Sequence, residues 1–311
     1  MTAILRKELA DYFTSIRFFV FFALVLLASA AGLWAASQGI RSTNLPEGFI
    51  FLGLFTTPGV IPLFNSLPVL IALIIPLIGI ALGFDAINSE RSGGTLSRIL
   101  AQPVYRDSVI NGKFLAGLVT MTIMIGAMIL LISGFGLRMI GVPPTAEEIL
   151  RLFLYLFLSI VYGAFWMGLA ILFSVLLRRV ASSLLTSLGI WLFFSIFIFM
   201  VAPWIASTVV PVTTESPQVE LIRYTELQLM IMRFSPNFLF QEATRAVINP
   251  MLVGSLGMVS ASQRAYLIPN PLSLGQSMLL IWPHLTGLIS LSAICFALSY
   301  VLFLRQEIRA T

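Results

Sequence analysis

The sequence predicts an all-α integral membrane protein with six transmembrane helices. Of its 311 residues, 59% are hydrophobic and 10% are charged, and the mean hydropathy is +1.00. A soluble domain usually has about 25% charged residues. Charge-free windows of about 20 residues, the length that crosses a bilayer core of about 30 Å, recur six times along the chain. The predicted spans cover about residues 18–37, 67–87, 114–137, 152–177, 180–203 and 280–304.

The stretch before the first span, residues 2–16, is predicted to be a helix lying in the membrane interface. Leu5, Leu9, Tyr12 and Ile16 share one face of a helix, as an in-plane amphipathic helix requires. A cleaved signal peptide fits less well, because two acidic residues precede the apolar run and the run is long enough to span.

The basic residues predict that both termini are cytoplasmic. They gather on alternate sides of the predicted spans, and the side with more Lys and Arg is the inner one. With the N-terminus inside, eleven of the eighteen basic residues are cytoplasmic: Arg6, Lys7, Arg17, Arg91, Arg98, Arg106, Lys113, Arg178, Arg179, Arg305 and Arg309.

The uncharged stretch from Gly48 to Phe84 is long enough for two spans, but only one is expected. A seventh span would weaken the charge bias, and Pro58, Pro62 and Pro68 interrupt the first half of the stretch. We therefore expect a re-entrant or interfacial outer helix there.

Residues 204–279 form the one long outer segment and are predicted to contain short helices. Ser235 is expected to cap a helix that begins at Pro236, runs to Ile248 and ends before Pro250. The single histidine, His284, is expected to be a polar residue at the outer start of the last helix.

The inner connection between the second and third spans, residues 88–113, is longer than a turn requires. Leu96, Ile99 and Leu100 fall on one face of a short predicted helix that Pro103 ends. An amphipathic helix outside the membrane needs a surface on which to bury its apolar face, and a soluble partner or the headgroup layer would supply one. A solvated linker whose charges only fix the topology is the alternative.

This connection resembles that of the permeases of the type-two ABC transporter class. It has the same order of a Glu, then Gly-Thr-Leu, then Pro and Arg, then Gly-Lys. The start of the chain, which includes Lys7, Glu8, Leu9 and Tyr12, resembles the elbow helix of the same permeases. The six-span layout with a long outer segment before the last helix also fits, and all 311 residues then form one permease domain.

The resemblance implies that the inner connection forms a coupling helix, which docks on a separate ATP-binding subunit. Three arginines are candidates for ion pairs with that subunit, and the three apolar residues of the predicted helix for its apolar contact. The residues expected to form or support the joint are Glu90, Arg91, Gly93, Gly94, Thr95, Leu96, Arg98, Ile99, Leu100, Pro103, Arg106, Gly112 and Lys113.

The chain has no phosphate-binding loop of its own, since Gly112-Lys113 is followed by Phe114 instead of Ser or Thr. We expect no cofactor, metal or catalytic residue on this chain, with ATP and Mg bound by the partner subunit. The expected assembly contains two ATP-binding subunits, this permease and a second copy or a similar permease, in contact with the lipids of a prokaryotic plasma membrane. Export is expected, because it is the commoner direction in this class, and no nucleic acid is expected to bind.

The pair Gly79 and Gly83 in the second span leaves two interpretations open, packing within the subunit or a dimer seam. Asp85 is expected to be a polar residue at the membrane boundary.

Two other functions remain as alternatives. A secondary transporter would need ionisable groups inside the spans to bind its driving ion, and the charge-free windows contain none. A structural or regulatory multi-pass membrane subunit without an ATPase partner is the second. An intramembrane enzyme is disfavoured, because the chain has one His and no acid pair within the spans.

Overall fold

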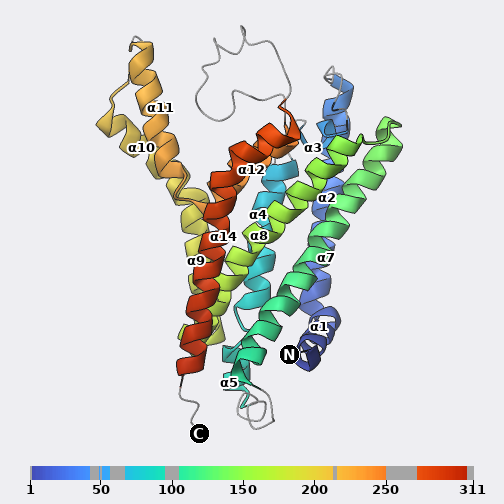
Figure 1. Ribbon diagram of the computed structural model, residues 1–311, viewed down its shortest axis with the longest axis vertical. Coiled ribbons are helices and arrows are strands. Elements are labelled where there is room, and N and C mark those ends of the chain that lie inside the picture. Colours follow the sequence, from blue (N-terminus) through green and yellow to red (C-terminus); the bar gives the residue numbers. More distant parts are fainter. Residues whose placement is uncertain are drawn as a thin grey trace. The chain divides into compact units, whose positions relative to one another are not determined.

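The computed structural model describes residues 2–42, 49, 51–56, 67–94, 105–212, 216–249 and 272–306, and all elements in these ranges are helices (Figure 1). Six of them are long and apolar enough to cross a membrane, which confirms the predicted number of spans. These candidate spans are Ile16–Trp34, Pro68–Ser92, Arg106–Arg138, Ala146–Leu176, Val180–Val209 and Leu274–Arg305.

The chain folds into two compact units. Unit 1 comprises residues 1–189 and 289–311, and unit 2 comprises residues 190–288. Unit 1 contains the C-terminal half of α14 (Leu274–Arg305), the first ten residues of α9 (Val180–Leu192) and seven complete elements: α1 (Thr2–Thr14), α2 (Ile16–Ser42), α3 (Gly53–Thr56), α4 (Leu67–Gly83), α5 (Asn88–Ser92), α7 (Arg106–Ile140) and α8 (Ala146–Leu176).

The packing of α4 on α8 is the most extensive helix contact in unit 1. It depends on Gly79 and Gly83, which face α8. A Cβ added at Gly79 would lie 2.8 Å from the carbonyl oxygen of Gly163, and one at Gly83 would lie 2.6 Å from that of Met167. Both glycines are therefore used for close packing within the chain.

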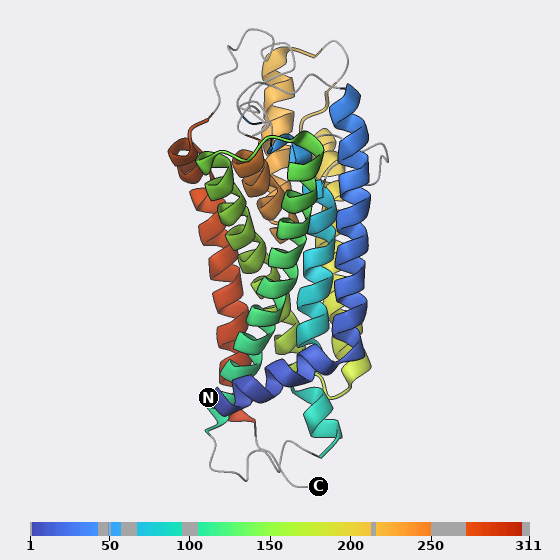
Figure 2. The same cartoon turned by 90° about the vertical axis from the view of Figure 1, so that its right-hand side faces the viewer.

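Helix α1 crosses the end of the bundle at a steep angle to α2 (Figure 2). The two helices meet at Ser15, where α1 has ended at Thr14. Ile16 therefore belongs to α2, where its side chain is 76% exposed, and it does not continue the apolar face expected for residues 2–16. The buried side chain of α1 is instead Glu8.

Several spanning helices are longer than the apolar windows that predicted them. Helix α8 begins at Ala146 because Thr145 and Glu148 form a reciprocal capping box. Helix α7 ends where Gly141 adopts a left-handed φ of 75°, and its amide donates to the carbonyl of Leu137. A search for charge-free windows stops at the first charged residue, whereas a helix continues to its cap.

The outer uncharged stretch contributes the short helix α3, at the place where an outer helix was expected. The backbone amides of Phe51 and Leu52 donate to Glu148 Oε1 at 2.9 and 3.2 Å. One buried carboxylate therefore caps α8 and holds the start of α3 beside it. Pro58 and Pro62 lie outside the described residues.

Unit 2 begins with the last residues of α9, and the π-helical turn η2 (Phe193–Phe197) then connects α9 to α10 (Ile198–Val209). Helix α11 (Gln218–Met232) packs beside α10, and α12 (Pro236–Ile248) follows it (Figure 1). The predicted cap of α12 is confirmed: Ser235 Oγ accepts from the amide of Phe238. The same hydroxyl donates to the carbonyl of Phe194 at 2.8 Å, within the π turn.

The last helix begins at Leu274, earlier than the predicted start at about residue 280. Ser273 and Gln276 explain the difference, because they exchange hydrogen bonds between side chain and backbone as a capping box does. The predicted outer segment, residues 204–279, therefore contains the ends of two long helices as well as α11 and α12.

Candidate functional site

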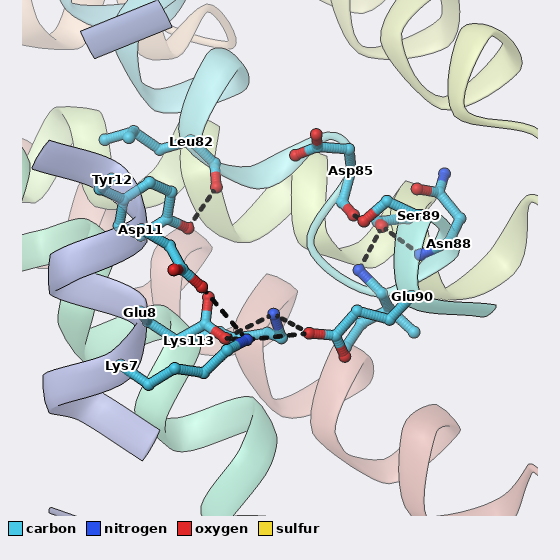
Figure 3. Close-up of polar contacts among 12 residues, drawn as sticks. Lys7, Glu8, Asp11, Tyr12, Leu82, Asp85, Asn88, Ser89, Glu90 and Lys113 are labelled. Carbon is cyan, nitrogen blue, oxygen red and sulfur yellow. Dashed lines mark hydrogen bonds and ion pairs between the residues drawn. The ribbon is translucent and has the colours of Figure 1, made fainter. Parts of the chain in front are cut away.

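A buried ion cluster lies at the end of unit 1 that carries α1. It comprises Glu8 on α1, Glu90 on α5 and Lys113 on α7. Lys113 Nζ lies 3.0 Å from Glu8 Oε1 and 2.8 Å from Glu90 Oε1, and Figure 3 shows the three side chains pointing toward one another. The side chains are only 6 to 11% exposed. Since an unpaired buried charge is strongly unfavourable, the cluster holds three separate helices in one arrangement.

Lys7 lies at the solvent edge of this cluster. Its Nζ is 3.1 Å from Glu8 Oε1 and 3.2 Å from Asp11 Oδ2, and its side chain is 53% exposed. Partial burial lowers the pKa of Lys7, but the carboxylates of Glu8, Asp11 and Glu90 outweigh this effect and raise the pKa above its usual value.

Two further contacts fix α1 against the bundle. A Cβ added at Gly112 would lie 2.8 Å from Ile4 Cγ2. Helix α1 therefore packs closely against α7 at Gly112 because this residue has no side chain. Tyr12 Oη donates to the carbonyl of Leu82 at 2.9 Å, one of the carbonyls left over at the end of α4. Burial raises the pKa of Tyr12 well above its usual value, so the hydroxyl keeps its proton.

Helix α5 is tied to α8 at its start and turns sharply at its end. The amides of Ile87 and Asn88 donate to Ser174 Oγ at 2.9 and 3.1 Å. After α5, Gly94 adopts a left-handed φ of 67°, which favours glycine. The predicted coupling residues Thr95, Leu96, Arg98, Ile99, Leu100 and Pro103 lie outside the described residues.

Both described ends of the inner connection contact the end of α14. Arg91 Nη2 donates to Gln306 Oε1, Arg106 Nη1 donates to the carbonyl of Gln306 at 3.0 Å, and Gln306 Nε2 donates to the carbonyl of Val175. Two of the arginines expected to pair with another subunit thus hydrogen-bond within this chain.

Sequence reasoning placed Glu8 in an elbow helix without finding its role in the ion cluster. The available signal was its position between Ile4 and Tyr12, four residues from each, on the side of the helix that carries apolar residues.

Asp85 pairs with Arg17 at the corner between α1 and α2, and Arg17 also lies over the ring of Phe84. Neither contact could be deduced from spacing along the chain.

A second charged cluster lies within unit 2. Glu242 on α12 accepts two hydrogen bonds from Arg233, at 2.8 and 3.0 Å, and its Oε2 lies 2.7 Å from His284 Nε2. Burial would raise the pKa of Glu242, but the hydrogen bonds and positive charges of His284 and Arg233 outweigh burial and bring the pKa to about 2. His284, expected to be a polar residue at the outer start of the last helix, belongs to a three-residue contact.

No group of three or more His, Cys, Asp or Glu side chains in the described ranges is arranged to hold a metal ion. In unit 1, the described ends of the connection between the second and third spans are joined by ion pairs and hydrogen bonds to α1, α7, α8 and the end of α14.

Comparison with known proteins identifies the family of this chain. The chain is 30% identical over 201 residues to a protein of Pseudomonas aeruginosa described as probable ABC transporter permease protein NosY, and 28% identical over 202 residues to the protein of that description from Stutzerimonas stutzeri. Each alignment covers 61% of this chain and 65% of the relative's length. A family model described as ABC-2 family transporter protein matches residues 2–308. Because that match covers nearly the whole sequence, the chain belongs to the ABC-2 family of transporter proteins.

Proposed function

We propose that this chain is the permease subunit of an ATP-driven transporter and that a separate ATP-binding subunit hydrolyses the ATP. The complex would contain two ATP-binding subunits and a second permease, either this chain or a similar one, in a prokaryotic plasma membrane. Both termini face the cytoplasm, and the transporter exports a substrate that remains to be identified. The family match and the six candidate spans support this assignment.

The observation that carries the proposal is the buried ion cluster of Glu8, Glu90 and Lys113. Glu90 lies on α5, directly before the segment that we propose to be the coupling helix, whereas Lys113 lies on the helix that follows it. A push on that segment would therefore reach α1 and α7 together. Such a joint suits a subunit that converts the movement of a soluble partner into a rearrangement of its spans.

The proposed docking residues are Leu96, Ile99 and Leu100. Replacing Leu96 and Leu100 with Asp would place two charges on the apolar contact, and we expect the ATP-binding subunit to be lost on purification in mild detergent. The Val142→Asp variant is the control, because it changes an exposed apolar residue in the connection after α7.

The measurement is the amount of Walker-motif protein that co-purifies with each variant, together with the ATPase activity of the preparation. Unchanged recovery with the double variant would refute the docking site. If no nucleotide-binding protein accompanies even the unsubstituted chain, the permease assignment fails and a structural membrane subunit becomes the better description.

A further inference from the structure

A cavity of about 330 Å³ opens at the corner between α1, α2 and α4 in unit 1. Its size falls at the lower end of the range for small-molecule sites, about 300 to 1,000 Å³. The buried ion cluster forms part of its wall, but most of the lining has no part in that cluster. The cavity is therefore a feature that the joint between helices does not explain.

The lining divides into an apolar part and a charged part. Phe18 and Phe21 on α2, with Ile78 and Leu82 on α4, contribute apolar side chains from within two candidate spans. The charged part comes from α1 and from the ends of the spans. This order matches the inner boundary of a bilayer, where hydrocarbon gives way to headgroups within a few ångströms.

The charged part carries an excess of one negative charge. Three cations, Lys7, Arg17 and Lys113, face four carboxylates, Glu8, Asp11, Asp85 and Glu90. The side chains of Lys7 and Arg17 are more than half exposed, as is that of Asp11. Both signs are therefore accessible to a ligand, whereas Lys113 is enclosed between its partners.

We propose that this cavity binds one phospholipid with a phosphoethanolamine headgroup. The acyl chains lie against the phenylalanines of α2 and the apolar residues of α4. The phosphate contacts Lys7 and Arg17, and the ammonium contacts Asp11 and Asp85. The lipid would thereby brace the corner between α1 and α2, and this role is independent of any ATP-binding subunit.

The charge balance selects this headgroup over others. An anionic phosphatidylglycerol would add a second negative charge to a lining that already has an excess of carboxylates. A phosphatidylcholine has the same net charge as the proposed ligand, but its quaternary ammonium has no N–H to donate to a carboxylate. Free glycerophosphoethanolamine has the same charges as the lipid headgroup and lacks the chains that would fill the apolar part.

The test is native mass spectrometry of the purified full chain in detergent, titrated with phosphatidylethanolamine, phosphatidylglycerol and phosphatidylcholine of identical acyl chains. We expect the first lipid to bind about tenfold more tightly than the other two. Free glycerophosphoethanolamine at the same concentrations is expected not to displace it. Equal binding of the three lipids, or displacement by the free headgroup, would overturn the proposal.

Three variants test where the lipid binds. Ala81→Phe fills the apolar part of the cavity, and we expect it to weaken phosphatidylethanolamine binding about tenfold. Ala30→Phe, the same change at an exposed position of α2, should leave binding unchanged. Asp11→Asn neutralises the excess charge at a side chain that is 60% exposed, so the preference over phosphatidylglycerol should shrink. If Asp11→Asn leaves that preference intact, the charged part is not the headgroup site, whatever the effect of Ala81→Phe.

Discussion

Lys113 is the residue on which the charges at the α1 end of unit 1 converge. Replacing it with Met would leave the carboxylates of Glu8 and Glu90 buried without their shared cation. Removing one partner from a buried pair typically costs about 3 to 5 kcal/mol. We expect a loss of unfolding free energy of about 3 kcal/mol, because Lys7 still contacts Glu8.

Lys7→Met is the matched control for this prediction. The substitution is the same and the lost contact is with the same Glu8 oxygen, but Lys7 is half exposed, so the expected loss is about 0 to 1 kcal/mol. Thermal unfolding in detergent can be followed with a thiol-reactive dye, since Cys295 is the single cysteine of the chain and is buried. Equal effects of the two variants would mean that Lys113 is not the centre of the cluster.

The sequence could identify these charges but not their meeting point. Glu90 and Lys113 belong to a recognisable pattern in the inner connection, and Glu8 to a short amphipathic stretch. Glu8 and Lys113 are 105 positions apart, and no periodicity relates them. The sequence alone supports the argument that a buried charge requires a partner. Which residue is the partner depends on how α1 folds back across the bundle.

At the scale of elements, helix ends depend on caps that hydropathy does not detect. The starts of α8 and α14 are set by Thr145 with Glu148 and by Ser273 with Gln276. Both pairs fit the pattern of a hydroxyl residue followed three positions later by Glu or Gln. The number of spans was therefore predictable from composition, while their bounds required this second signal.

The contact between α4 and α8 predicts that Gly83→Ala is destabilising. Its Cβ would lie 2.6 Å from the carbonyl oxygen of Met167 and 2.9 Å from Ala170 Cβ, and a backbone atom cannot move aside without separating the helices. We expect a loss of about 1 to 3 kcal/mol. Gly126→Ala on α7 is the control, because its Cβ would meet nothing within 4 Å and alanine favours a helix over glycine by about 0.5 to 1 kcal/mol.

The same experiment checks that the glycine pair serves packing within the chain, as its contacts with α8 indicate, and not a dimer seam. Packing within the chain predicts a lower unfolding temperature for Gly83→Ala whatever the oligomeric state. A dimer seam predicts weaker association, measured by size-exclusion chromatography with light scattering, and an unchanged unfolding temperature of the monomer.

Glu242 on α12 contacts His284 on α14 and Arg233, the residue after α11. Its lowered pKa predicts that the stability of unit 2 depends on pH. The folded-state pKa of about 2 lies below the ordinary value of 4.5, so the carboxylate stabilises unit 2 fully above about pH 4.5. That contribution is lost as the pH falls from 4.5 toward 2. Glu242→Gln should therefore be clearly less stable than the unsubstituted chain at about pH 6, and the difference should shrink at about pH 3.

Glu226→Gln is the control for this pH dependence, because it removes an exposed carboxylate of α11. It should change the unfolding temperature little at either pH. A difference between Glu242→Gln and the unsubstituted chain that stays constant from pH 6 to pH 3 would contradict the assigned role of the ion pairs.

At the scale of the whole molecule, the contacts of unit 1 bring basic residues together at one end. Lys7, Arg17 and Lys113 line one cavity, and Arg91 and Arg106 meet at Gln306, although the first two lie more than 70 positions from the other three in the sequence. The positive-inside rule identifies the end richer in Lys and Arg as the cytoplasmic one. The fold therefore supports the same orientation that the order of charges along the chain predicts.

This orientation is testable by thiol labelling in intact cells. In a Cys295→Ser background, Ser92→Cys places an exposed thiol at the last residue of α5, at the basic end, and Val142→Cys places one in the connection after α7. Because α7 is long enough to cross the membrane, the two positions should lie on opposite sides. A membrane-impermeant maleimide should label Val142→Cys in intact cells and Ser92→Cys only after permeabilisation. The reverse pattern would place the ion cluster outside, where no ATP-binding subunit could reach it, and would refute both the predicted topology and the proposed coupling.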